Sequence, residues 1–166
     1  MPSKTYKNLT IAKQDRILAA LLNEFSHYSL ADAQVDRIVK DAGIARGAFY
    51  KYFDDLTDAY QTLFRQAMAA VHHDVSDPTE AFDPAAYYTA VASFVDHFQD
   101  NKYSALIRRH YSENESLLPE EPTPASLSSA DWAAMVLSHA TIKAMMSHPS
   151  SAVMDRFRQA LELLKE

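Results

Sequence analysis

Apolar residues recur at intervals of three and four along most of the chain, and this spacing predicts helices and no strands. The clearest stripe lies in a helix predicted over about residues 11–25, with Thr10 as a candidate N-cap. Its apolar side is formed by Ile17, Leu18, Leu21, Leu22 and Phe25. A helix with one buried face is therefore expected near the start of the chain.

Two short helices are predicted next, over about residues 34–41 and 45–52, on either side of Gly43. Asp32 is a candidate cap for the first of them. Glycine adopts the left-handed conformation that ends many helices with little strain, so Gly43 is predicted to form a tight turn. Two short helices joined in this way have the layout of a helix-turn-helix, whose second helix enters the major groove of DNA.

A longer helix is predicted over about residues 55–73, with Asp55 as its N-cap, and it is long enough to connect two bodies. The segment DVSDPTEAFDP that follows contains Pro78 and Pro84 and is predicted to be a linker. We therefore expect one domain over residues 1–54 and a second over residues 55–166.

Four further helices are predicted over about residues 87–98, 103–115, 129–147 and 150–165, with an exposed loop at LLPEEPTPASLSS. The expected fold class is therefore all-α. The last two helices carry apolar residues on more than one face, which predicts a second buried surface. Pairing of these two helices with their copies in a second chain would make a four-helix interface.

Composition and charge narrow the function. Hydrophobic residues make up 48% of the chain, cysteine is absent, and no apolar run approaches the length that spans a bilayer. We expect a soluble cytoplasmic protein with no membrane association. The net charge is +1 over residues 1–65 and −7 over residues 66–166, so an anionic partner is expected at the N-terminal part.

The segment GIARGAFYKYFDDL concentrates the candidate chemistry. Phe49 and Phe53 are predicted to lie on one side of the second short helix and to pack into the core. The side chains of Tyr50 and Tyr52 are predicted to point elsewhere, where their hydroxyl groups can donate to phosphate oxygens. Arg46 has the donors to bind a guanine edge in two places. The alternatives are that these tyrosines are ordinary, partly buried aromatics and that Arg46 is a solvated charge.

Gly47 lies in the first turn of the same helix, where it weakens the helix by about 1 kcal/mol relative to alanine. This cost predicts either that the backbone comes close to another surface or that the glycine packs against the first long helix.

At these residues the chain resembles the TetR family of bacterial transcriptional repressors. The resemblance covers roughly residues 10–65 and rests on ILAALLNEF, VDRIVKDAGIARGAFYKYF and DDLTDAYQTLF. It implies an all-helical homodimer, an N-terminal domain that binds an operator, and a C-terminal domain that takes a small inducer and pairs with its copy. By the same resemblance the DNA-binding residues are Gln34, Ala45, Arg46, Gly47, Ala48, Tyr50, Lys51 and Tyr52.

The chain departs from the family pattern at three positions. Ala33 and Ala45 stand where the family has capping hydroxyl residues before the two short helices, and Leu56 stands where it has a lysine. Operator affinity is therefore expected either to be modest or to depend also on Lys4, Lys7 and Lys13.

Large aromatic and methionine side chains are more numerous in the second domain than a small helical core needs, which predicts a pocket for an apolar or aromatic molecule. The candidate lining residues are Met68, Phe94, Phe98, Tyr103, Ile107, Tyr111, Trp132, Met135 and His139. The alternative is that they form an ordinary core. The histidines lack the spacing of helical ligand pairs, so neither a metal nor a cofactor is expected.

The favoured hypothesis is a ligand-responsive repressor that binds a palindromic double-stranded DNA operator as a homodimer. The alternative is a repressor-like dimer that acts as a protein-interaction module without binding DNA. An enzyme is not expected, because no nucleophile has a nearby base in a defined frame.

Overall fold

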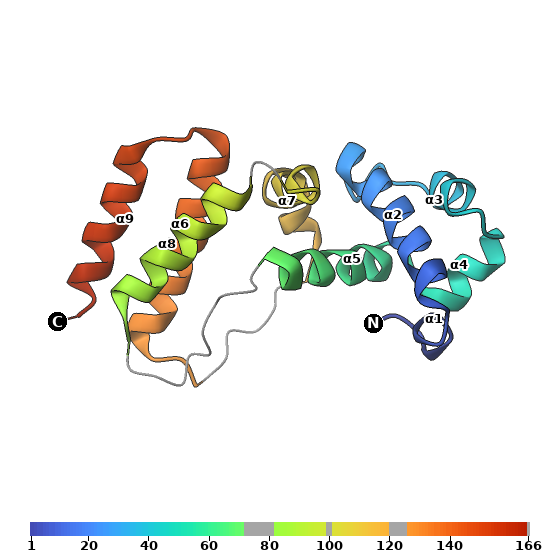
Figure 1. The fold of residues 1–166 in the computed structure, drawn as a ribbon, viewed down its shortest axis with the longest axis horizontal. Coiled ribbons are helices and arrows are strands. Elements are labelled where there is room, and N and C mark those ends of the chain that lie inside the picture. The colour runs from blue at the N-terminus through green and yellow to red at the C-terminus, as the bar shows by residue number, and fades with distance from the viewer. Residues whose placement is uncertain (72–81, 99–100, 120–125, 166) are drawn as a thin grey trace. The chain divides into compact units, whose positions relative to one another are not determined.

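The computed structural model describes residues 1–71, 82–98, 101–119 and 126–165, and every regular element in these ranges is a helix (Figure 1). The α-helices are α1 Lys4–Lys7, α2 Ile11–His27, α3 Val35–Ala42, α4 Arg46–Tyr52, α5 Leu56–Val71, α6 Pro84–Phe98, α7 Ser104–Arg109, α8 Ser129–Ser147 and α9 Ser151–Leu163. A π-helical turn, η1 His110–Asn114, and a 3-10 turn, η2 Glu115–Leu117, follow α7. The predicted all-α fold is confirmed.

The chain forms two compact units. The N-terminal unit contains residues 1–70 and 102–119, and the C-terminal unit contains residues 71–101 and 120–166. This division differs from the boundary predicted after residue 54, because α5 and residues 102–119 pack with the N-terminal helices. Tyr60 of α5, for example, places its ring edge-to-face against Phe25 of α2, with centroids 5.0 Å apart.

Aromatic and aliphatic side chains of the first helices form the core of the N-terminal unit. Phe49 and Phe53 are 0% and 1% exposed, and their ring centroids lie 5.4 Å apart. Phe25, predicted on the apolar side of α2, is fully buried, and so is Ile38 of α3. Burying a phenylalanine side chain of this size stabilises the fold by about 1.5–3 kcal/mol, so Phe49 and Phe53 hold α4 in the core, where it packs on α1 and α3.

The turn between α3 and α4 has the predicted geometry. Gly43 is the C-cap of α3 with φ 60° and ψ 43°, which is the left-handed conformation. The N–H of Ile44 donates to the carbonyl oxygen of Val39 at 3.0 Å and satisfies one of the last carbonyls of α3. The helix-turn-helix is thus closed by backbone geometry that suits glycine best.

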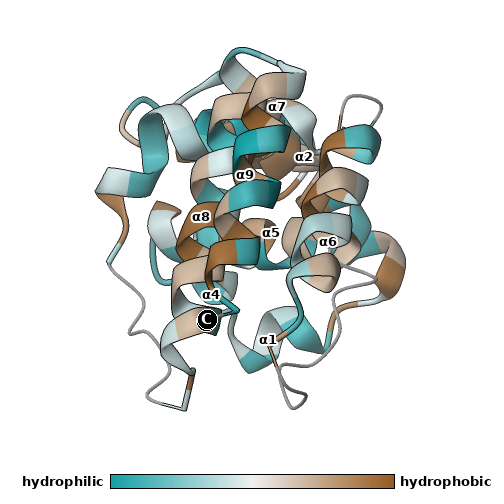
Figure 2. Cartoon of the chain, turned by 90° about the vertical axis from the view of Figure 1, so that its left-hand side faces the viewer, coloured by the Kyte–Doolittle hydropathy of each residue, from teal (hydrophilic) through white to brown (hydrophobic). Residues whose placement is uncertain are grey.

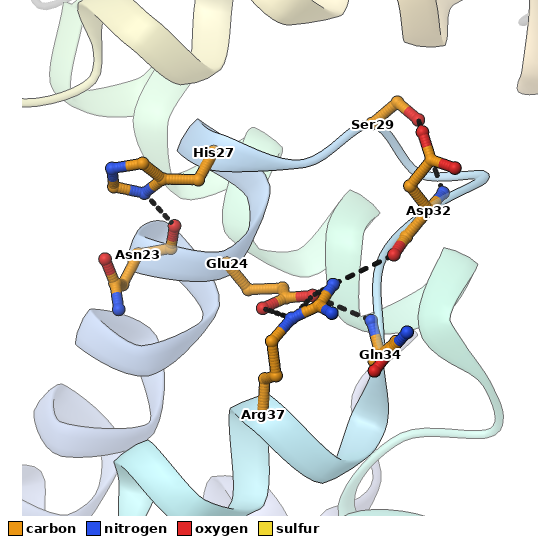
Figure 3. A network of polar contacts seen from close by, with 7 residues as sticks. All are labelled: Asn23, Glu24, His27, Ser29, Asp32, Gln34 and Arg37. Carbon is orange, nitrogen blue, oxygen red and sulfur yellow. Dashed lines mark hydrogen bonds and ion pairs between the residues drawn. The ribbon is translucent and has the colours of Figure 1, made fainter.

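The start of α3 is capped differently from the prediction. Gln34 is the N-cap, and its N–H donates 2.7 Å to a carboxylate oxygen of Glu24, which projects from α2. Asp32, the predicted cap, instead accepts from the hydroxyl of Ser29 at 2.7 Å. In Figure 3, dashed lines join the carboxylate of Glu24 to Gln34 and to Arg37. A carboxylate that is distant in sequence therefore replaces the local cap.

Glu24 also binds the side chain of Arg37. The Nε of Arg37 donates to both carboxylate oxygens of Glu24, at 3.0 and 2.9 Å, and its Nη2 donates at 2.6 Å. This hydrogen bonding raises the pKa of Arg37, and the guanidinium also lies 3.7 Å from the centre of the Tyr28 ring. Because Glu24 is only 4% exposed, this ion pair braces α3 against α2 from within the unit.

The first helix, α1, has no counterpart in the sequence prediction. Ser3 is its N-cap and accepts from the N–H of Tyr6 at 3.1 Å. The hydroxyl of Ser3 also donates 2.7 Å to the carbonyl oxygen of Lys51, and its N–H donates 3.0 Å to that of Tyr52. The segment before α2 therefore closes the C-terminal end of α4.

The helix predicted over residues 103–115 is not a regular α-helix throughout. After α7 the chain continues through the π-helical turn η1, where His110 stacks on Phe64 with centroids 3.8 Å apart. The hydroxyl of Tyr60 lies 2.9 Å from Nδ1 of His110. Asn114 is fully buried, and its side-chain oxygen accepts from the N–H of Leu30 at 2.8 Å. These contacts attach η1 to α5 and to the loop after α2.

The C-terminal unit consists of α6, α8 and α9, which pack on one another. Its buried side chains include Val91, Phe94, Phe98, Ala134, Ile142, Met146, Phe157 and Leu161. The hydroxyl of Tyr87 donates to Asp131 at 3.1 Å, and burial, with Asp131 as the second cause, raises the pKa of Tyr87 to about 12. In Figure 2, hydrophobic stretches run along α8, whereas α9 carries more hydrophilic ones.

Parts of two predicted irregular segments lie outside the described residues. These are residues 72–81, which cover the end of the helix predicted over 55–73 and most of the predicted linker, and residues 120–125 of the predicted loop. Pro84 of the predicted linker is the first residue of α6. Among the described helices, none has both the length and the apolar character needed to cross a membrane.

Candidate nucleic-acid interface

The exposed side of α4 carries most of the predicted DNA-binding residues. Residue exposure is high for Gln34, Ala45, Arg46, Gly47, Tyr50 and Lys51, and intermediate for Ala48. The helix begins at Arg46, and its N-cap Ala45 has no side-chain oxygen that could accept a hydrogen bond from the N–H groups of the first turn. The first backbone N–H groups of α4 therefore lie beside an exposed, uncapped helix start, where an anion is stabilised by the helix dipole.

Arg46 is held by two side-chain partners. Its Nη1 donates to Asp36 of α3, and its Nη2 lies 3.5 Å from the hydroxyl of Tyr50. The hydrogen bond to Asp36 is the main cause that raises the pKa of Arg46, so the guanidinium stays charged. Tyr50 rests edge-to-face on the buried Phe49, with centroids 5.3 Å apart, and is 50% exposed. The arginine and the phenol are thus presented together on a helix fixed from behind.

Tyr52 does not point away from the core, so the predicted orientation of its side chain is wrong, whereas its predicted contact with phosphate stays a prediction. It is 5% exposed, and its ring lies 6.1 Å from that of Tyr6 and 6.5 Å from that of Phe53. The ammonium of Lys13 lies 5.9 Å from the ring centre. Because Tyr52 follows Phe49 by three positions, it shares the buried side of α4. Its role in this structure is to join α4 to α1.

Gly47 is exposed on the first turn of α4, and a Cβ placed there would meet no atom within 4 Å. The alternative that Gly47 packs against the first long helix is therefore excluded by the described residues. The second explanation for Gly47 is that another molecule comes close to the backbone at this position, and it stays a prediction.

Lysines of the N-terminal segment lie near the far end of α4. Lys4 and Lys7 are exposed on α1, and Ser3 ties this helix to the carbonyls of Lys51 and Tyr52. The predicted contribution of Lys4 and Lys7 thus has a geometric basis, because their helix is attached to α4. The cationic end of Lys13 is placed next to the same junction by its contact with Tyr52.

Comparisons with known proteins agree with this geometry. Residues 17–56, which contain most of α2 and all of α3 and α4, match the model of bacterial regulatory proteins of the tetR family. This helix-turn-helix region is therefore of the TetR type. An uncharacterized HTH-type transcriptional regulator of Bacillus subtilis (strain 168), YdgC, is 33% identical to this chain over 75 residues. The match covers 45% of the chain and only 36% of the length of YdgC.

Two solved structures share the fold of this chain over almost its whole length. A TetR transcriptional regulator from Rhodococcus sp. RHA1 matches with a TM-score of 0.57 and 20% identity, covering 92% of this chain and 96% of the other. A TetR family transcriptional regulator from Chloroflexus aurantiacus J-10-FL matches with a TM-score of 0.53 and 19% identity, covering 99% and 96%. At these identities the likeness establishes the fold.

The nine predicted ligand-lining residues are divided between the two units. Met68, Tyr103, Ile107 and Tyr111 belong to the N-terminal unit, and Phe94, Phe98, Trp132, Met135 and His139 belong to the C-terminal unit. Trp132 is 49% exposed and His139 is also exposed, so within their own unit these two line no enclosed space. Phe94 and Phe98 are buried and stack on each other, with centroids 5.7 Å apart.

The structure also contains polar features that the sequence did not single out. A surface cavity of about 280 Å³ lies between α2 and α3 and is lined by Ala20, Asn23, Glu24, His27, Tyr28, Arg37 and Asp41. None of these residues was predicted to bind a ligand. Within the described ranges, no group of three or more histidine, aspartate or glutamate side chains could hold a metal ion.

Proposed function

We propose that this protein is a transcriptional regulator of the TetR family that binds double-stranded DNA with α4 in the major groove. The observation that carries the proposal is the two-sided character of α4. Phe49 and Phe53 fix its buried side, and Arg46, Gly47, Tyr50 and Lys51 are exposed on the other. A short helix presented rigidly behind a left-handed glycine turn is the arrangement by which a helix-turn-helix reads base edges.

Each exposed residue has a distinct role in the proposed complex. Arg46 donates to a guanine edge, while Tyr50 and Lys51 donate to phosphate oxygens. The open space over Gly47 admits a sugar or phosphate close to the backbone. Because these contacts displace counterions, the affinity for DNA falls as the salt concentration rises.

We further propose that the protein acts as a homodimer on a palindromic operator. The support is α8, which buries Ala134, Ile142 and Met146 on one side and exposes Trp132 and Val136 on another. Exposed apolar side chains of this size on a helix suit a twofold interface with a second copy. Two copies place their α4 helices in successive major grooves, about 34–36 Å apart.

An inducer completes the proposal. A small apolar or aromatic molecule binds among the large side chains of the helices after α4 and releases the protein from the operator. It does so only if it prefers the conformation that cannot bridge both grooves. The support is the content of aromatic and methionine side chains, of which Met68 and Met135 are only partly buried.

A second candidate function is a protein-interaction module that does not bind DNA. Two observations favour it. Arg46 is already engaged by Asp36, and Leu56 replaces the lysine found in the family at the start of α5. Exposed Tyr50 and Lys51 on α4 argue for DNA instead.

Binding to duplexes with a randomised centre, followed by selection and sequencing, separates the two functions. Wild-type protein is expected to enrich a palindromic sequence, Arg46→Ala to lose the enrichment, and Tyr50→Phe to weaken binding to all duplexes. Arg65→Ala, which removes an exposed arginine from α5, is the matched control and keeps the enrichment. Wild-type protein that retains no duplex at low salt contradicts DNA binding and favours the interaction module.

A further inference from the structure

An ion pair spans the two helices of the helix-turn-helix on their exposed side. Asp36 lies in the first turn of α3 and Arg46 is the first residue of α4. Nη1 of Arg46 donates to a carboxylate oxygen of Asp36, although both side chains are well exposed, at 56% and 73%. The pair therefore sits where the proposed DNA contact is made.

Folding stability does not explain this pair, because exposed ion pairs contribute little to it. A carboxylate beside the proposed DNA contact also repels phosphate groups. The neighbouring arginine on α3 does not compete for Asp36, since Arg37 is bound to Glu24. Asp36 thus has Arg46 as its cationic partner across the turn.

The guanidinium of Arg46 keeps donors for another acceptor. Nη1 donates to Asp36 and Nη2 lies near Tyr50, whereas a guanidinium carries further N–H groups in a planar fork. Two partners on one planar group restrict its rotation, which lowers the entropy that is lost when a base binds. A guanine edge, which accepts two hydrogen bonds, can then bind the remaining N–H groups of Arg46.

We propose that Asp36 is a specificity-determining residue that positions Arg46 for a base edge and competes with phosphate for its guanidinium. This inference rests on the proposed DNA-binding function. At an incorrect sequence Arg46 would have to bind a phosphate beside the Asp36 carboxylate, which repels it, or give up the ion pair, so non-specific binding is weakened. At the correct sequence the base accepts from the remaining donors, and the ion pair is retained. Specificity is a difference of two affinities, and Asp36 acts on both.

The test compares two affinities for each variant. One probe is a duplex enriched by the wild-type protein from the randomised pool, and the other is an unselected duplex of the same length. Asp36→Asn is expected to bind the unselected duplex more tightly and to lower the ratio of the two affinities about tenfold. In an Arg46→Ala background, Asp36→Asn is expected to leave the ratio unchanged, because the partner is absent.

Two further variants separate positioning from charge and from folding. Asp41→Asn removes an exposed carboxylate from the other end of α3, where it accepts from Asn23 at 3.1 Å, and is expected to keep the wild-type ratio. Asp36→Glu keeps the charge and is expected to restore most of the specificity. Thermal melting of each variant shows whether α3 still folds.

Three results overturn the inference. In the first, Asp36→Asn strengthens binding to both duplexes equally. In the second, Asp41→Asn lowers the ratio as much as Asp36→Asn does. In the third, Asp36→Asn changes the ratio equally with and without Arg46. Each of them leaves the proposed function intact, whereas wild-type protein that enriches no sequence overturns the proposed function and the inference with it.

Discussion

The N-terminal and C-terminal units differ in how completely they bury their apolar and polar side chains. In the N-terminal unit, aromatic rings from α1, α2, α4 and α5 are buried against one another, and Glu24 holds three donors inside the fold. In the C-terminal unit, α8 buries one side and leaves Trp132 and Val136 exposed on another. The first unit completes its core within one chain, whereas α8 carries more apolar surface than α6 and α9 cover.

The charges differ between the two units as well. The N-terminal unit holds twelve Lys/Arg against ten Asp/Glu, a net charge of +2, and the C-terminal unit holds four against twelve, a net charge of −8. The acidic unit repels phosphate, so contact with DNA is expected to be confined to the N-terminal unit. The comparison therefore agrees with the proposal that the N-terminal unit binds nucleic acid and that the C-terminal unit pairs with its copy.

Truncating Phe49 is expected to break the N-terminal unit. Phe49→Ala leaves a cavity in the middle of its core and should cost about 3–5 kcal/mol in the free energy of unfolding. The measurement is urea denaturation followed by circular dichroism. The matched control is Tyr50→Phe, which keeps a ring at the adjacent exposed position and should leave melting nearly unchanged. Equal losses in the two variants would contradict the assignment of the two faces of α4.

Placing a charge on α8 is expected to break the C-terminal pairing. Val136→Glu puts a carboxylate into the proposed twofold interface and should weaken it by about 3 kcal/mol, roughly a hundredfold in dissociation constant. Sedimentation velocity measures the change from dimer to monomer. Because Val136 is 45% exposed within its own chain, helicity should stay unchanged. Gln66→Glu, which adds the same charge on α5, is the control and should leave the dimer unchanged. Wild-type protein that sediments as a monomer would contradict the proposed pairing.

Removing the hydroxyl of Tyr6 is expected to change how the stability of the N-terminal unit depends on pH. This hydroxyl is buried and has no hydrogen-bond partner among the described residues, so Tyr6→Phe should stabilise the protein at neutral pH by about 1 kcal/mol. Burial, followed by the charge of Asp15, raises the pKa of Tyr6 from 10.0 to about 12. The folded state therefore favours the neutral phenol.

The stability that depends on this phenol is complete below pH 10 and is lost as the pH rises from 10 to about 12. Urea denaturation at neutral pH and within that window should show that wild-type protein loses more stability than Tyr6→Phe does. Identical pH profiles for the two proteins would mean that Tyr6 is solvated in solution.

The smallest expected effect is that of Gly47→Ala. A Cβ at this position meets no atom within 4 Å, and alanine favours the helix, so the variant should gain about 0.5–1 kcal/mol of stability. Affinity for DNA should nevertheless fall, because the methyl group fills the space into which the backbone of DNA is proposed to enter. Denaturation and duplex binding, measured on the same preparation, test the expected gain in stability and the expected loss of affinity. A variant that binds DNA as tightly as wild type contradicts the close approach.

The sequence predicted those features that depend on neighbours a few residues away. The helix predicted over residues 11–25 is α2, Gly43 has the predicted left-handed turn, and Phe49 and Phe53 are buried as expected. Each of these follows from periodicity or from backbone sterics, both of which are visible in a short window.

Features that depend on distant partners were not predicted. The four residues of α1 are too few to show periodicity, and the burial of Tyr52 follows from the packing of α1 on α4. Glu24 caps α3 from ten positions upstream, where no local capping pattern reveals it. The π-helical turn at His110 differs from an α-helix only in its hydrogen bonds, and composition does not record this difference. The predicted ligand residues cannot be assembled from sequence, because a pocket depends on how helices meet.

Ser3 has a practical consequence for anyone who handles this protein. Its hydroxyl and N–H occupy the last carbonyls of α4, those of Lys51 and Tyr52. A purification tag or fluorescent protein fused directly ahead of Ser3 is expected to compete for that position and to fray the end of α4. Assays of the proposed DNA binding on such fusions would then underestimate the affinity of the untagged protein, and cleavage of the fusion partner should restore it.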